Sequence, residues 1–200
     1  MTTFLLIRHG DTDAVGKVLA GWSPGWHLNH HGQHQVERLS ERLKTMRIGA
    51  VYTSPLERAV ETGEPIARTH GLDVRKAAEL GEMRVGEWEG LPFAELDTRE
   101  DWRAFNTFRT AVRPPGGELM IETQQRMIRK LHCLGEQYAN ETIAVVSHAD
   151  PLRAVIGYYL GLPLDGVLRL EISTASLSVV QADRWGARVL CVNQTEQVPV

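Results

Sequence analysis

The sequence of 200 residues has little cysteine, little lysine and no long apolar run. Its two cysteines, Cys133 and Cys191, lie far apart, which excludes a disulfide framework and a cysteine-based zinc site. We expect both to be small buried hydrophobic residues in a reducing compartment. No stretch approaches the ~20 apolar residues of a membrane span, and the N-terminal apolar run is too short for a signal peptide. These features predict a cytoplasmic protein that binds no membrane.

An excess of charge of one sign is also lacking. The formal net charge is −3, so the chain is not a generally basic nucleic-acid binder. The 42% hydrophobic and 24% charged fractions are typical of a globular protein and exclude the disordered and collagen classes. Of the 22 basic residues only 4 are lysine, so 18 are arginine. Arginine suits planar, bidentate contact with carboxylate or phosphate, although a GC-rich genome would produce the same excess.

Strand-like and helix-like segments alternate along the chain. Four short runs are rich in β-branched or aliphatic residues, and two of these are nearly continuously apolar, as in buried parallel strands. Segments between them place apolar residues at helical spacing. This alternation predicts a doubly wound, three-layer α/β/α fold with a mostly parallel sheet and helices on both faces. The predicted strands are 4–7, 50–53, 142–147 and 176–181, and the predicted helices are 32–46, 55–70, 118–138 and 150–159.

Two helix beginnings carry clear sequence signals. Ser54 is a predicted N-cap, with Pro55 at the first helical position and Glu57 completing a capping box. Asp150 followed by Pro151 is a second predicted cap and first-turn pair. The free N–H groups and positive dipole of such helix N-termini favour a bound anion.

Residues 79–117 break the alternation, because glycines, prolines and aromatic residues are interspersed there. We interpret this stretch as a partly helical lid inserted over one edge of the sheet, within a single domain that comprises residues 1–200. Trp88 and the phenylalanines of the insertion are expected to pack the lid.

Polar side chains follow three predicted strands at the point where each strand ends. Arg8 and His9 follow the first strand, Arg58 follows the second, and His148 follows the strand 142–147. Ligands bind at the carboxyl ends of the strands in open α/β sheets. Two guanidinium groups can hold the oxygens of a phosphoryl group by charge-assisted hydrogen bonds. One neutral imidazole could then attack phosphorus, with a nearby carboxylic acid protonating the leaving oxygen and the cationic side chains taking the place of a metal ion.

Four ordered motifs carry a family resemblance. They are Arg8-His9-Gly10, Ser54-Pro55-Leu56-Glu57-Arg58-Ala59 with Thr62, Glu82-x-x-x-Gly86-x-Trp88-Glu89-Gly90, and Val146-Ser147-His148 with Arg153-Ala154. In this order and over most of the chain, the motifs resemble those of the histidine phosphatase superfamily, the phosphoglycerate-mutase-like group.

The resemblance implies a role for each matching residue. His9 would be the phosphorylated nucleophile, with Arg8, Arg58 and His148 forming the phosphate pocket. Glu82 would be the proton donor, with Glu89 as the second choice. Further expected substrate contacts are Gly10, Thr12, Gly21, Trp22 and Ala149, with no metal and no other cofactor.

Three positions depart from the family pattern. Residues 13–16 supply no asparagine, Ala149 replaces a common glycine, and Leu119 replaces a common serine. None of these departures falls on Arg8, His9, Arg58 or His148.

Two enzymatic activities and one binding function fit these motifs. Phosphoglycerate mutases typically have a longer insertion with paired arginines for a second phosphate, whereas Arg109 and Arg113 are spaced apart and precede a Pro-Pro-Gly-Gly-Glu run. We therefore predict a metal-independent phosphatase of the histidine acid type that acts on a small phosphorylated metabolite. The alternatives are a cofactor-dependent phosphoglycerate mutase and a non-catalytic module that binds phosphorylated ligands.

Other features have simpler interpretations. His27, His30, His31 and His34 form a cluster that we interpret as an exposed group at the beginning of a helix rather than a metal site. Trp22 and Trp26 either line the mouth of the pocket or pack their own loop. Exposed aromatic residues in the insertion would be compatible with a homodimer.

Overall fold

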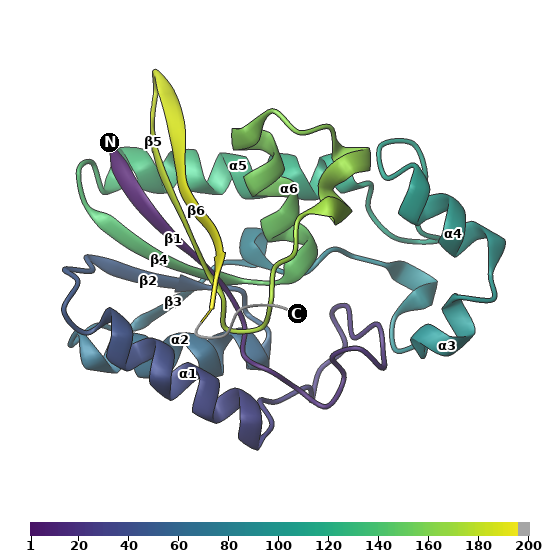
Figure 1. The fold of residues 1–200 in the computed structure, drawn as a ribbon, viewed down its shortest axis with the longest axis horizontal. Helices are drawn as coiled ribbons and strands as arrows, with labels where there is room; N and C mark the ends of the chain where they lie inside the picture. Colours follow the sequence, from purple (N-terminus) through teal and green to yellow (C-terminus); the bar gives the residue numbers. More distant parts are fainter. Residues whose placement is uncertain (196–200) are drawn as a thin grey trace.

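A six-stranded sheet forms the middle layer of the computed structural model, which describes residues 1–195. The last part of the predicted domain, 196–200, lies outside the described residues. Helices α1 and α2 cover one face of the sheet, and α5 and α6 cover the other (Figure 1). The strands are β1 Thr2–Arg8, β2 Ala50–Thr53, β3 Val74–Lys76, β4 Thr142–Ser147, β5 Leu177–Asp183 and β6 Gly186–Gln194. The α-helices are α1 His30–Leu43, α2 Glu57–Thr69, α3 Phe93–Leu96, α4 Glu100–Thr107, α5 Met120–Gln137 and α6 Ala149–Leu160.

The strand order is β3-β2-β4-β1-β5-β6. Neighbouring strands from β3 to β1 are parallel, while β5 and β6 are antiparallel additions at one edge. The predicted three-layer fold with a mostly parallel sheet is therefore confirmed. Strands β3 and β6 were not predicted, because β3 has only three residues and the edge strand β6 is largely exposed and lacks the signature of a buried strand.

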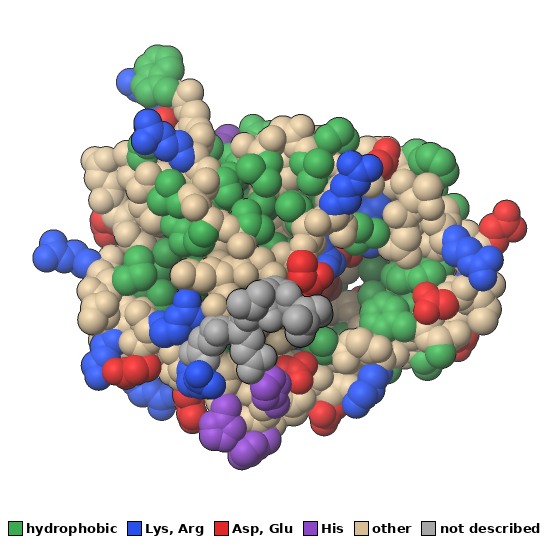
Figure 2. All heavy atoms as spheres, viewed as in Figure 1, with side chains coloured by type: hydrophobic (Ala, Val, Ile, Leu, Met, Phe, Trp, Pro, Cys, Tyr) green, Lys and Arg blue, Asp and Glu red, His purple; other side chains and the backbone are tan. Residues whose placement is uncertain are grey.

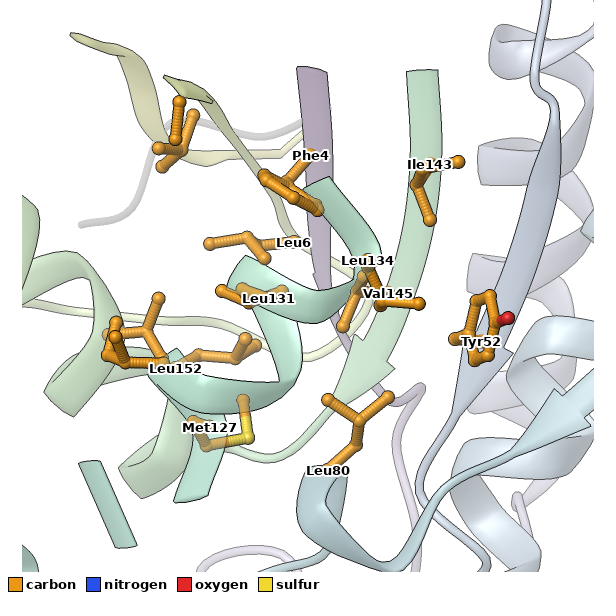
Figure 3. Close-up of a cluster of buried hydrophobic side chains, with 14 of the residues drawn as sticks. Phe4, Leu6, Tyr52, Leu80, Met127, Leu131, Leu134, Ile143, Val145 and Leu152 are labelled. Atoms are coloured by element: carbon orange, nitrogen blue, oxygen red, sulfur yellow. The ribbon is translucent and has the colours of Figure 1, made fainter. Parts of the chain in front are cut away.

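The continuous apolar run of β1 arises because both faces of the sheet are covered. Leu5 and Ile7 face the cluster that includes apolar side chains of α1 and α2. Phe4 and Leu6 face the cluster that includes α5 and α6 (Figure 3). Each of these side chains is almost fully buried, and each contributes about 1.5–3 kcal/mol to folding. The double packing fixes the position of the residues that follow β1.

Two predicted helix caps are wrong, because their side chains have other partners. Helix α2 begins at Glu57 with Leu56 as its cap, and the Ser54 hydroxyl is hydrogen-bonded to Nε2 of His148 over 2.8 Å. Helix α6 begins at Ala149 with His148 as its cap. Asp150 instead lies inside the first turn, where its carboxylate forms ion pairs.

The insertion consists of short helices that lie beyond one end of the sheet (Figure 1). Besides α3 and α4 it contains the 3₁₀ helices Ala78–Leu80 and Gly86–Trp88. Trp88 and Phe105 are buried in a separate apolar cluster that also includes Ala154 of α6. Phe108, in contrast, is 56% exposed, so it does not pack the insertion as expected.

The expected burial of the cysteines is also wrong. Cys133 is exposed on α5 and Cys191 is half-buried on the edge strand β6, and neither forms a disulfide. Leu131 and Leu134 take the buried face of α5, which leaves Cys133 on the outer face. Within residues 1–195, no helix is long and apolar enough to span a lipid bilayer.

The packing of α5 on the sheet gives a stability prediction. Leu131 is fully buried in the cluster of Figure 3, so Leu131→Ala should lower the free energy of unfolding by about 2–5 kcal/mol. Leu190→Ala, at a position that is 55% exposed, should change it by less than about 0.5 kcal/mol. Denaturant unfolding of both variants measures the difference, and equal values would contradict the packing described for α5.

Candidate active site

The parallel strands bring the chemically important residues to one edge of the sheet. Strands β2, β4 and β1 are neighbours, so their carboxyl ends lie together. His9 follows β1, His148 follows β4, and Arg58 lies in the first turn of α2 after β2. The backbone pairing of β1 with β4 extends one residue beyond β1, where the N–H of His9 donates to Ser147 O over 3.0 Å. The hydrogen-bonded sheet therefore positions His9, His148 and Arg58.

His9 is held as a neutral imidazole with one nitrogen free. His9 is 95% buried, and its Nδ1 lies 2.7 Å from the carbonyl oxygen of Gly10. A carbonyl only accepts, so Nδ1 carries the hydrogen and Nε2 keeps its lone pair. Burial, followed by the charges of Arg58 and Arg8, lowers the pKa of His9 well below its usual value. Nε2 is thus available as a nucleophile at neutral pH.

His148 lies against His9 in an edge-to-face arrangement, with ring centroids 5.1 Å apart. It is fully buried, and its Nε2 is hydrogen-bonded to the Ser54 hydroxyl. Its Nδ1 has no hydrogen-bond partner within residues 1–195 and lies 4.0 Å from a carboxylate oxygen of Glu82. Burial and the charge of Arg58 lower the pKa of His148 well below its usual value. This ring is therefore also neutral.

Arg8 and Arg58 each retain an unused donor. Arg8 donates through Nη1 to the carbonyl of Ile172, and Arg58 donates through Nη2 to the carbonyl of Gly21. The Nε of Arg8 and the Nη1 of Arg58 are buried and have no acceptor within the described part of the chain. Neither guanidinium forms an ion pair with a carboxylate there. Because a buried, unsatisfied charge is costly, the pair favours binding of an anion.

Glu82 comes from the insertion and adds a carboxyl group to the same site. One of its oxygens accepts the N–H of Met83 over 2.8 Å. Burial and the nearby charge of Asp150 raise the pKa of Glu82 to about 7, against the lowering effect of Arg58. A carboxyl group with this pKa can both donate and accept a proton near neutral pH. Glu89, the second choice for the acid, accepts the N–H of Trp22 and does not line the cavity.

These groups surround a cavity of about 260 Å³, which suits a small ligand. In Figure 2 a hollow is visible beside the insertion. Apolar residues from the loop after β1 and the insertion's Phe93 and Trp102 form part of its wall. The predicted site residues that line it are Arg8, His9, Thr12, Gly21, Arg58, Glu82 and Ala149.

Three other predicted site residues do not line the cavity. His148 packs edge to face against His9 and is not part of the cavity lining. Gly10 contributes backbone only: its N–H donates to the Thr62 hydroxyl, and its carbonyl accepts from His9. The Trp22 indole N–H donates to the carbonyl of Glu82 over 2.6 Å. Trp22 therefore contacts the segment that carries Glu82, and the half-buried Trp26 also lies outside the cavity lining.

The sequence did not indicate a second polar group in the cavity. Arg109 of the insertion is 97% buried and donates to Asp150 over 2.6 Å, and Arg153 donates to the other oxygen of Asp150. Asn106 accepts from Arg109. The spacing of Asp150 and Arg153 by three positions on a helix is the one signal for this group. This signal was missed because Asp150 followed by Pro151 also fits the pattern of a helix cap.

The histidine cluster lies apart from the cavity. His27, His30, His31 and His34 are all exposed, as predicted, near the beginning of α1, where histidine side chains gather in Figure 2. His30 and His34 pack edge to face, and His27 pairs with Glu61. Within residues 1–195, no group of three or more His, Cys, Asp or Glu side chains is arranged to hold a metal ion.

Comparison with known proteins agrees with this geometry. The sequence profile described as "Histidine phosphatase superfamily (branch 1)" matches residues 4–195. The chain belongs to the histidine phosphatase superfamily. The predicted resemblance is therefore confirmed, and membership in this superfamily supports an enzyme.

The relatives that match this chain are named for different activities. A bifunctional protein of Mycobacterium tuberculosis is 35% identical over 97% of this chain, and the chain spans 54% of that protein's length. Phosphoserine phosphatase 1 of Hydrogenobacter thermophilus is 28% identical, with 98% of this chain and 93% of that protein aligned. A probable phosphoglycerate mutase of Klebsiella pneumoniae is 32% identical, with 92% and 88% aligned. The solved structure of YhfR from Bacillus stearothermophilus superimposes with a TM-score of 0.89 at 26% identity, covering 95% of this chain and 96% of that one.

The raised pKa of Glu82 gives a prediction for the pH dependence of this site. If Glu82 must be protonated, kcat/KM should fall as pH rises through about 7. Asp150 raises that pKa, so Asp150→Asn should move the fall to lower pH. Asp165→Asn removes an exposed carboxylate outside the cavity and should leave the profile in place. A profile of kcat/KM against pH that is unchanged in Asp150→Asn would contradict this electrostatic coupling.

Proposed function

We propose that the protein hydrolyses phosphate monoesters through a phosphohistidine intermediate on His9. The observation that carries this proposal is the group of unpartnered, buried nitrogens around that ring: Arg8 Nε, Arg58 Nη1 and His148 Nδ1. A phosphoryl group offers oxygen acceptors on several sides, and guanidinium groups bind such oxygens strongly. The free lone pair of His9 Nε2 supports nucleophilic attack in the same place.

In the first half-reaction, Nε2 of His9 attacks phosphorus and forms an N–P bond. The bond between phosphorus and the leaving oxygen breaks, and Glu82 gives its proton to that oxygen. Arg8 and Arg58 hold the other phosphoryl oxygens and offset their charge while the transition state forms. The hydrogen bond from Nδ1 to Gly10 O strengthens as the imidazole becomes positively charged.

In the second half-reaction, the carboxylate of Glu82 takes a proton from water, and the water oxygen attacks phosphorus. The N–P bond breaks and its electron pair returns to Nε2, so His9 is again neutral. Inorganic phosphate leaves, and Glu82 is again protonated. A pKa of about 7 suits both roles of Glu82.

The charge around the cavity favours a substrate with one phosphate. Four arginines and Asp150 line it. A phosphate dianion and Asp150 together offset three of these four positive charges. The fourth is on Arg153, which besides its contact with Asp150 is paired only loosely, over 3.5 Å, with the exposed Glu171 and so remains available to the leaving group. A carboxylate or a neutral polar group fits this balance, and one relative is named a phosphoserine phosphatase. We therefore propose small phosphate monoesters, including those of hydroxy acids, as the substrate class.

The same charges favour hydrolysis over phosphoglycerate mutase activity. A second phosphate group would need further unpaired cations, but Arg109 is paired with Asp150. Arg113 lies outside the cavity lining, is 45% exposed and pairs with Glu122. A non-catalytic phosphate-binding module is also disfavoured, since it would gain from a charged histidine, whereas burial keeps the pKa of His9 low.

Substitution of the nucleophile tests the proposal. His9→Ala should lower kcat for phosphoserine and for p-nitrophenyl phosphate by at least about a thousandfold, because the covalent route is lost. Phosphate release is measured in the presence of EDTA, which should not affect the unaltered protein. His34→Ala, at an exposed histidine outside the cavity, is the matched control and should retain full activity.

Two results would contradict the proposal. One is full activity in His9→Ala. The other comes from incubating the unaltered protein with bisphosphoglycerate and phosphoglycerate. Exchange of phosphoryl groups between these compounds that is faster than release of inorganic phosphate would favour the mutase.

A further inference from the structure

The Pro-Pro-Gly-Gly-Glu run at 114–118 packs directly against the segment that carries Glu82. The N–H of Glu87 donates to Pro115 O, and the N–H of Glu118 donates to Arg84 O, each over 2.8 Å. Gly86 has a φ of +56°, and a Cβ there would meet Pro115 O at 2.0 Å. A Cβ on Gly117 would meet Arg84 O at 2.4 Å. The two segments approach so closely that only glycine fits at both positions.

Arg126 of α5 connects Glu118, at the end of the 114–118 run, to the segment that carries Glu82. It donates through Nη1 to the carbonyls of Glu79 and Gly81 at 2.6 and 2.9 Å, and through Nη2 to the carbonyl of Glu82 at 2.8 Å. Its remaining donors go to both carboxylate oxygens of Glu118, through Nε over 3.2 Å and Nη2 over 2.7 Å. All five N–H groups of the guanidinium are thus used.

Glu118 and Trp22 complete the support of this segment. The Glu118 carboxylate also accepts the N–H of Arg84, two residues after Glu82. The side chains of Arg126 and Glu118 are only 16% and 14% exposed, so little solvent competes with the ion pair. The carbonyl of Glu82 accepts from Trp22 Nε1 as well as from Arg126. The backbone at Glu82 is therefore held on both sides.

We propose that Arg126, held by Glu118, is a positioning residue that fixes the Glu82 carboxyl group for proton transfer to the leaving oxygen. This inference rests on the proposed phosphatase function. Arg126 does not line the cavity, so it acts through the backbone of residues 79–82. Lysine would keep the charge of Arg126, but its three donors cannot serve all five acceptor contacts.

The test uses two substrates that differ in their need for an acid. The p-nitrophenolate group leaves without a proton, whereas the alkoxide of phosphoserine must be protonated. Arg126→Lys should lower kcat/KM for phosphoserine by at least about tenfold, because kcat/KM reports the transfer of the phosphoryl group to His9 and the acid for that step is misplaced. The kcat/KM for p-nitrophenyl phosphate should fall by less than about threefold, because hydrolysis of the phosphohistidine, in which Glu82 also acts, comes after the steps that kcat/KM reports.

The ratio of the two rates does not depend on how much of the variant is folded, because an unfolded fraction lowers both rates alike. Glu118→Gln keeps the shape of the side chain but removes the ion pair, so it should change the ratio in the same direction. Arg129→Lys alters an exposed arginine on the same helix and should change neither rate.

A double substitution distinguishes an effect that acts through Glu82 from a loss of activity that does not involve Glu82. In a Glu82→Gln background, Arg126→Lys should cause no further loss with phosphoserine, since the proton donor is already absent. Equal losses on the two substrates, or a full further loss in that background, would overturn the inference while the phosphatase function stands. If the unaltered protein hydrolyses neither substrate, the proposed function fails, and this inference fails with it.

Discussion

Two arginine guanidinium groups, on Arg8 and Arg58, lie at the ends of parallel strands, and no carboxylate of residues 1–195 forms an ion pair with either of them. This is the electrostatic constraint on which the rest of the site depends. Together with burial, these charges lower the pKa values of His9 and His148 and keep both rings neutral. They also act to lower the pKa of Glu82, but burial and Asp150 outweigh them. The site therefore combines attraction for an anion with a neutral imidazole and a carboxyl group whose pKa lies near 7.

The energetic cost of this arrangement is offset elsewhere in the fold. The sheet is packed on both faces, and the apolar clusters on either side hold β1 and β4 in register up to their last residues. The insertion then adds what the sheet cannot provide. It supplies Glu82, the acid of the proposed mechanism, and Arg109 as a further cation, which the first turn of α6 holds through Asp150. The close contact of Gly86 with Pro115 holds the two ends of the insertion together, and the hydrogen bonds of Arg126 to carbonyls within residues 79–82 join the insertion to α5.

Much of the fold was predictable because the signals were local. The continuous apolar runs of β1 and β4 indicate strands covered on both faces, and the ends of those strands indicate where the charged residues meet. The two cap predictions failed for one physical reason. Ser54 and Asp150 are good helix caps in isolation, but His148 hydrogen-bonds the first, and Arg109 and Arg153 pair with the second. The contacts of Arg109 and Arg126 depend on how the insertion packs, which residue spacing does not reveal.

The covalent state of His9 during turnover is the most direct test of the proposed mechanism. The protein is mixed with substrate, stopped within a single turnover in alkaline denaturant, which preserves phosphohistidine, and digested for mass spectrometry. One phosphoryl group is expected on the peptide that contains His9, where it appears and then decays as inorganic phosphate forms. Release of phosphate without any phosphoryl group on His9 at any time would contradict this mechanism.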